Sequence, residues 1–214
     1  MTATLLDKAA GLLFPPRCPL CGQLAQQEDC CCPACDKQLR RLGDDAVTAL
    51  EDCFVYSPFC YAPPLTQAVY RFKFQGQQQL SVYFAQEMAR LLAERFGPAL
   101  PFDRITYVPM PPLREQYRGY NQAQLLALEL GQRFGLPVED CGLTRQEGFA
   151  QHDLSRSMRQ KQADGGFDIR PGVALSGTVL LVDDLCTTGA TLRSCVRLLQ
   201  GAGAGLCAAA TLCR

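Results

Sequence analysis

From residue 63 onward, apolar residues recur in alternating helix-like and strand-like patterns. The helix-like pattern, with apolar side chains three and four positions apart, occurs in segments 64–74, 78–96, 121–135 and 190–203. Shorter apolar runs that predict strands occupy residues 103–110, 177–184 and 205–214. Residues 177–184 are apolar on both faces, which suits an interior strand of a parallel sheet. The alternation of strands and helices predicts an α/β fold, with a parallel sheet flanked by helices.

The first 60 residues have a different character, because they are rich in cysteine and poor in long periodic segments. Residues 1–16 predict an amphipathic helix that ends at two successive prolines. Residues 144–172 are polar and basic and predict an exposed loop. We therefore divide the chain into a small N-terminal module, residues 1–60, and an α/β domain, residues 61–214.

Composition and charge narrow the classes of function. The 21 basic and 21 acidic residues give zero formal net charge, which argues against a protein that binds nucleic acid over its whole surface. Contact with DNA would need a local positive patch. The basic residues are 17 arginines and 4 lysines, and the arginine fork suits phosphate and carboxylate groups.

No apolar run reaches the ~18 to 20 residues that span a bilayer. The N-terminus lacks the basic start of a signal peptide, so we expect a cytoplasmic, reduced protein.

Two C-x2-C turns, CPLC and CPAC, lie ten residues apart in the N-terminal module. Two such turns present four thiolates to one tetrahedral ion. The spacing predicts a structural zinc ion held by Cys18, Cys21, Cys32 and Cys35, with Cys31 as the alternative to Cys32. Cys53 and Cys60 lack this spacing and are expected to be buried as small apolar residues.

An acidic pair leads into a threonine- and glycine-rich loop in the segment VLLVDDLCTTGAT, residues 179–191. The predicted strand delivers two carboxylates to its carboxyl end, where open α/β sheets bind ligands. Backbone N–H groups at the start of the next helix would hold a phosphate. The carboxylates suit vicinal sugar hydroxyls, directly or through a magnesium ion, so the segment predicts a ribose 5-phosphate site. A plain strand-to-helix turn is the alternative. The candidate residues are Asp183, Asp184, Thr187, Thr188, Gly189, Ala190 and Thr191.

The same segment resembles the phosphoribosyl-pyrophosphate (PRPP) motif of type I phosphoribosyltransferases. Four further blocks extend the resemblance to ComF/GntX-like proteins over nearly the whole chain: CPLCG…CPAC, YAPPL…YRFKF, VPMPPLREQYRGYNQAQLL and LTRQEGFAQHDLSRSMRQ. The resemblance implies a type I phosphoribosyltransferase-like sheet with an N-terminal zinc ribbon. A second cysteine set carried by longer relatives is missing here apart from Cys53, which leaves a second zinc without ligands.

The resemblance also implies roles for individual residues. Asp183 and Asp184 would contact the ribose hydroxyls, residues 187–191 would hold the 5-phosphate, and the pyrophosphate loop would follow Val108. Residues 150–162 correspond to the flexible loop that covers PRPP. The candidates for pyrophosphate or DNA contact, with solvated surface charges as their alternative, are Arg114, Arg118, Arg156, Arg159 and Lys161. Gly119 and Asn121 lie just beyond Arg118. Lys73 is expected to be an exposed helix lysine, with an approach of its helix to the site as the alternative, and His152, the single histidine, is not expected to act as a base.

Two functions are consistent with these residues. The resemblance implies a PRPP-binding protein, with magnesium, that handles single-stranded DNA during natural transformation. In this case Arg114 and Arg118 would neutralise phosphates while Tyr117 and Tyr120 stack on bases. The alternative is a phosphoribosyltransferase that acts on a small nitrogenous acceptor. Thr187 stands where purine-salvage relatives carry an acidic base, which disfavours a 6-oxopurine acceptor. A complete glutamine amidophosphoribosyltransferase is not expected, because no glutaminase domain is present in the sequence.

Overall fold

The computed structural model describes residues 16–25, 31–146 and 166–214. Of the helix expected in residues 1–16, only residue 16 is described. The expected PRPP-covering loop, residues 150–162, lies outside the described residues, and so do its residues named above, His152, Arg156, Arg159 and Lys161. No helix within the described ranges is long and apolar enough to cross a membrane.

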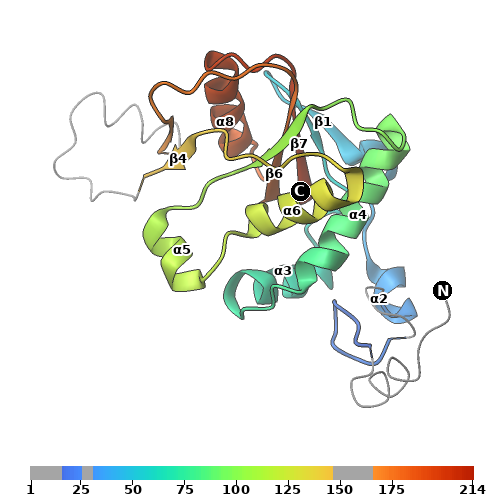
Figure 1. Cartoon of the computed structure of the whole chain (residues 1–214). Coiled ribbons are helices and arrows are strands. Elements are labelled where there is room, and N and C mark those ends of the chain that lie inside the picture. Colours follow the sequence, from blue (N-terminus) through green and yellow to red (C-terminus); the bar gives the residue numbers. More distant parts are fainter. Residues whose placement is uncertain (1–15, 26–30, 147–165) are drawn as a thin grey trace, which may run out of the picture.

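A five-stranded sheet forms the centre of the protein, with strand order β1-β2-β7-β6-β3 (Figure 1). The four strands β2, β7, β6 and β3 are parallel, and β1 pairs antiparallel with β2 at one edge. Their bounds are β1 Val47–Ala49, β2 Phe54–Tyr56, β3 Arg104–Tyr107, β6 Val179–Leu185 and β7 Cys207–Cys213. Every residue of β7 is buried, because helices cover both faces of the sheet. The predicted α/β class with a mostly parallel sheet is confirmed.

Helices pack on both faces of this sheet, and the strand period decides which residues meet them. Along β6, Leu180 and Val182 belong to the apolar cluster that contains residues of α3, α4 and α6. Val179 and Leu181 belong to the cluster that contains α8, because successive side chains of a strand point to opposite faces. The helix bounds, close to those predicted, are α3 Leu65–Phe74, α4 Leu80–Phe96, α6 Gln122–Phe134 and α8 Ala190–Gly201.

Several short elements were not predicted. The exposed loop expected at 144–172 is wrong at its two ends, where β4 (Leu143–Arg145) and β5 (Phe167–Ile169) form an antiparallel pair. The buried side chains of Leu143 and Phe167 anchor this pair against α8. The turn expected after Val108 contains the helix α5 (Pro112–Arg118), which begins with proline, a residue favoured in the first turn of helices. Strands β1 and β2 have three residues each, too few for a readable period.

The cysteine-rich module contains the short helix α2 (Pro33–Gln38) and a 3-10 turn, Gly43–Ala46. Residues 47–56, which were assigned to this module, instead extend the main sheet through β2 and β7. The division at residue 60 stays a prediction, because strand pairing does not decide which segment folds independently.

Replacing Gly131 by alanine is expected to destabilise the protein by about 1–3 kcal/mol. A Cβ atom at Gly131 would lie 2.4 Å from Cγ2 of Val138 and 2.9 Å from the carbonyl oxygen of Leu136. Gly201→Ala is the matched control, since no atom lies within 4 Å of a Cβ there. It should be neutral or stabilise α8 by up to about 1 kcal/mol. Urea denaturation measures the free energy of unfolding of both variants. Equal changes for the two substitutions would contradict the packing argument.

Candidate functional site

Four cysteines of the N-terminal module bring their thiols together. The sulfur atoms of Cys18, Cys21, Cys32 and Cys35 all lie within 4.8 Å of one another, and those of Cys21 and Cys32 are 3.7 Å apart. A tetrahedral zinc ion with Zn–S bonds of ~2.3 Å would separate its sulfurs by about 3.8 Å. The four thiols therefore fit one structural metal ion such as zinc.

The geometry favours Cys32 over Cys31 as the fourth metal ligand. Cys32 occupies the N-cap of α2 within the group of four, whereas the thiol of Cys31 lies 3.6 Å from Oδ1 of Asp36 and outside that group. Cys53 is buried, as expected, and Cys60 is only half-buried.

Backbone N–H groups favour the thiolate of Cys18. Gly22 adopts a φ of 75°, and its N–H donates to the carbonyl oxygen of Cys18 at 2.8 Å, which closes the first C-x2-C turn. The N–H of Cys32 donates to Sγ of Cys18 at 3.3 Å. Burial disfavours the Cys18 thiolate, but N–H donors led by that of Cys32 outweigh burial and lower the pKa of Cys18 to about 7. Burial and the neighbouring thiols raise the pKa of Cys35, so four thiolates would need a cation between them.

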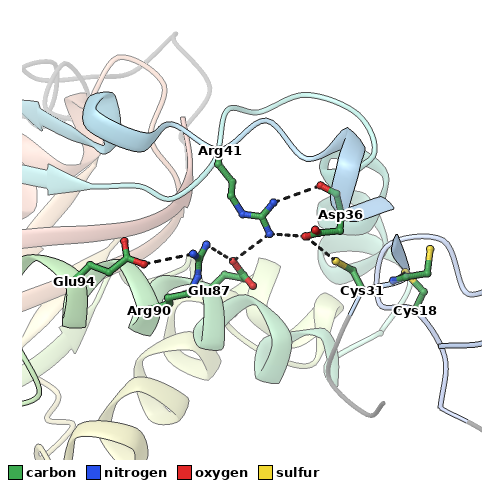
Figure 2. Close-up of polar contacts among 8 residues, drawn as sticks. Cys18, Cys31, Asp36, Arg41, Glu87, Arg90 and Glu94 are labelled. Carbon is green, nitrogen blue, oxygen red and sulfur yellow. Dashed lines mark hydrogen bonds and ion pairs between the residues drawn. The ribbon is translucent and has the colours of Figure 1, made fainter. Parts of the chain in front are cut away.

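A network of charged side chains attaches the module to α4, as Figure 2 shows. Arg41 donates to Oδ1 of Asp36 at 2.7 Å and lies 3.9 Å from Oε2 of Glu87. Glu87, on α4, is largely buried and also pairs with Arg90 at 3.0 Å. The hydrogen bond from Arg41 lowers the pKa of Asp36. The network therefore links α2 to α4 through one arginine.

The predicted acidic pair lies at the carboxyl end of β6 and lines a cavity of about 230 Å³. Asp184 is buried, and its Oδ1 lies 2.9 Å from Nζ of Lys73. Burial and the adjacent Asp184 charge raise the pKa of Asp183 to about 7. The expectation that Lys73 is an exposed helix lysine is therefore wrong, because α3 delivers its ammonium group to the acidic pair.

Positive side chains from two further elements line the same cavity. Arg114 and Arg118 come from α5, and Arg145 comes from β4. The Arg118 guanidinium lies over the Phe74 ring, 5.0 Å from its centroid, and burial lowers its pKa although Asp184 opposes this shift. Burial likewise lowers the pKa of Arg145. With Lys73, four cationic side chains face two carboxylates, an arrangement that attracts an anion with several negative charges.

Arg145 was not assigned a role from the sequence. It lies in the block LTRQ, within the segment that was expected to be a loop. The signal that could have found it is the alternation of Leu143, Thr144 and Arg145, but three residues are too few to define a strand period.

The loop after the acidic pair, where the sequence predicts a phosphate site, leads into α8 through Gly189. Gly189 is the N-cap of α8 with a φ of 73°, and a Cβ atom there would lie 2.7 Å from Leu50 of the β1–β2 turn. Glycine is therefore required at this position. Thr187, Thr188 and Ala190 are exposed, whereas Thr191 lines the acidic cavity. The structure thus brings Thr191 together with the acidic pair, and places Thr187, Thr188 and Gly189 in the adjoining loop and Ala190 at the start of α8.

Asn121 holds the start of α6 against the end of β3. Its side-chain oxygen accepts hydrogen bonds from the N–H groups of Ala123 and Gln124, which confirms the predicted helix cap. Its amide nitrogen donates to the carbonyl oxygen of Val108 at 3.0 Å. Asn121 therefore fixes the turn that follows β3, beside the cavity that the acidic pair lines.

An exposed groove of about 780 Å³ adjoins the cavity, and we call it the aromatic groove. Its lining residues are Tyr70, Lys73, Phe74, Gly76, Arg114, Tyr117 and Arg118. The cavity and the aromatic groove share Lys73, Phe74, Arg114 and Arg118.

Of the two tyrosines expected to stack on bases, one is exposed and one is buried. Tyr117 is 95% exposed, but Tyr120 is buried and its hydroxyl donates to the carbonyl oxygen of Phe72. The expectation for Tyr120 is therefore wrong. Tyr70 and Phe74, with ring centroids 5.1 Å apart, present exposed aromatic surface instead. Their four-residue spacing on α3 could have indicated this shared face.

The chain is similar to curated bacterial proteins over most of its length. It is 33% identical over 162 residues to the DNA utilization protein YhgH of Escherichia coli strain K12, covering 72% of this chain and 69% of that protein. It is 30% identical over 188 residues to the competence protein ComFC of Bacillus subtilis strain 168, covering 87% of this chain and 72% of that protein. No protein-family model matches the chain.

Among solved structures, the glutamine PRPP amidotransferase from B. subtilis aligns with a TM-score of 0.43 and 20% identity. The alignment covers 62% of this chain and 26% of that protein. This likeness is too weak to support an inference about function.

Purified protein is expected to contain about one zinc ion per chain. Replacing Cys18 and Cys21 by serine removes two of the four sulfur ligands, so the metal should be lost and the midpoint of thermal unfolding should fall. Cys31→Ser is the matched control, because this thiol lies outside the group of four. Elemental analysis measures the metal. Zinc-free native protein, or loss of zinc from the Cys31→Ser variant alone, would contradict the assignment.

Proposed function

This chain belongs to the ComF-like family of the ComFC and YhgH proteins, and we propose that it binds PRPP at the carboxyl end of β6. One observation carries this proposal. Two carboxylates, four cationic side chains and Thr191 at the start of α8 line a single cavity. A ribose with phosphates at both ends needs groups of these three kinds.

Each part of PRPP has a chemical counterpart in the site. Asp183 and Asp184 would accept hydrogen bonds from the two ribose hydroxyls, and residues 187–191 would hold the 5-phosphate with backbone N–H groups and threonine hydroxyls. Arg114, Arg118 and Arg145 would neutralise the pyrophosphate.

Magnesium would be held by the PRPP oxygens together with the acidic pair. When bound, it would stabilise the negative charge of departing pyrophosphate. Binding of a cation here would also favour the ionised form of Asp183, whose pKa is raised to about 7.

The aromatic groove favours a role in handling single-stranded DNA during natural transformation. Tyr70, Phe74 and Tyr117 offer exposed ring faces, and each base that stacks on an aromatic ring gains roughly 1–3 kcal/mol. Arg114 and Arg118 would neutralise the strand phosphates. The net charge of the chain is zero, so this local patch would supply the electrostatic attraction. The reduced thiols needed for the metal site are consistent with a cytoplasmic location.

A second candidate function is phosphoribosyl transfer to a small nitrogenous acceptor in nucleotide metabolism. The same groove supports it, because an aromatic heterocycle bound between Phe74 and Tyr117 would lie beside the PRPP cavity. The two functions differ in product. Transfer would release pyrophosphate when PRPP and the acceptor are mixed, whereas strand binding would leave PRPP intact.

Replacing Asp183 and Asp184 by asparagine is expected to weaken PRPP binding by roughly 100-fold or more, because each hydrogen bond to a charged group contributes roughly 1.5–3 kcal/mol and two are lost. Isothermal titration calorimetry with PRPP and magnesium measures this. Asp44→Asn combined with Asp45→Asn is the matched control, since this adjacent acidic pair is exposed and remote in sequence from the cavity. It should leave the affinity within about twofold of native. Equal affinities for the native protein and the Asp183/Asp184 variant, or no binding by the native protein, would refute the proposal.

Single-stranded DNA binding should weaken and depend less on salt when Arg114 and Arg118 are replaced by alanine. Two lost phosphate contacts reduce the salt slope by about 1.4, at roughly 0.7 per contact. Tyr117→Ala should lower the affinity about tenfold and leave the slope unchanged, because stacking involves no counterion release. Fluorescence anisotropy with a labelled oligonucleotide measures both quantities.

Arg133→Ala combined with Arg170→Ala is the control, because both arginines are exposed and do not line the aromatic groove. It should bind the oligonucleotide as the native protein does. If the native protein fails to bind even at low salt, the DNA role is wrong and transfer to a small acceptor becomes the better hypothesis.

A further inference from the structure

Three consecutive residues of α3 face three different parts of the molecule. Arg71 contacts the cysteine module, Lys73 pairs with Asp184, and between them the carbonyl oxygen of Phe72 accepts hydrogen bonds from the Tyr120 hydroxyl and the Gln122 side chain. The last carbonyls of a helix have no partner within it, so Phe72 is free to make these contacts. The end of α3 therefore joins the module to the acidic cavity.

The contact of Arg71 with the module is specific. Its Nη2 donates to the carbonyl oxygens of Pro19 and Leu20, each at 2.8 Å, and its Nε donates to Oε1 of Gln77 at 3.1 Å. Pro19 and Leu20 are the two residues between the thiols of Cys18 and Cys21. A metal ion bound to these thiols would fix the turn and keep both carbonyl oxygens directed at one nitrogen.

We propose that Arg71 is a positioning residue through which the metal-bound cysteine module holds Lys73 against Asp184. Loss of the metal or of Arg71 loosens the end of α3 and moves the Lys73 ammonium away from the acidic pair. The effect on PRPP affinity rests on the proposed function, whereas the effect on Lys73 does not.

Arg41 provides a matched control. It also attaches the module to the domain, but it does so through Glu87 of α4 and makes no contact with α3 (Figure 2). Arg71→Gln and Arg41→Gln each remove one arginine that anchors the same module. If the module acts on the cavity through α3, only Arg71→Gln should affect Lys73.

The first readout is the rate at which Lys73 is acetylated, followed by mass spectrometry on the full-length protein. Lys73 has a side chain only 20% exposed and lies in an ion pair, so it should react slowly in the zinc-loaded protein. Arg71→Gln, or removal of zinc with a chelator, should raise the rate about fivefold, which equals ~1 kcal/mol and is typical of one or two hydrogen bonds. Removal of zinc from Arg71→Gln should add little further.

The second readout is PRPP affinity with magnesium, measured by calorimetry on the same samples. Arg71→Gln should retain zinc and bind PRPP several-fold more weakly, while Arg41→Gln should bind as the native protein does. An unchanged Lys73 rate in Arg71→Gln, or equal increases in both variants, overturns the inference. A raised Lys73 rate in a protein that never binds PRPP confirms the coupling and refutes the proposed function instead.

Discussion

Two adjacent carboxylates at the end of a strand buried on both faces must be compensated by positive charge, and this constraint organises the site. Two carboxylates this close together, with Asp184 buried and Asp183 half-buried, are costly to ionise at the same time, and the pKa of Asp183 is raised accordingly. Lys73 compensates Asp184 directly at 2.9 Å. The other compensating charges come from α5 and β4, so elements distant in sequence are held together around one cavity.

Two of the four cations have an additional support. Arg118 lies over the Phe74 ring and donates to Gln122 at 2.5 Å, and Arg145 lies over the Phe167 ring, 4.7 Å from its centroid. Such rings hold a guanidinium group without neutralising it, so its charge remains available to a ligand. An anionic ligand would therefore meet cations that are already ordered, which reduces the entropic cost of binding.

The parts of the site that could be predicted from the sequence are those encoded within a few residues. The spacing of Cys18 and Cys21 and the run from β6 into α8 determine local geometry by themselves. The role of Lys73 and the burial of Tyr120 depend on which helix packs beside which strand, and no local pattern records that. Strands β1 and β2 were not predicted for a related reason. Three residues per strand give no period, and the pairing of β2 with β7 joins segments that are distant in the sequence.

The arginine excess, which suggested anion recognition, has a second explanation in the structure. Arg71 donates hydrogen bonds to two carbonyl oxygens of the cysteine-rich module. Arg41 pairs with Asp36 and lies 3.9 Å from Oε2 of Glu87. Arg71 also donates from Nε to Gln77, and Arg41 donates from two nitrogens to Asp36. Each side chain therefore uses fixed donors on more than one nitrogen, which lysine lacks. Leu20, which lies between two of the clustered thiols, is fully buried in the same apolar cluster as residues of α3 and α4. The module is therefore part of the core that positions the acidic pair, and some arginines serve this assembly while others face the ligand cavity.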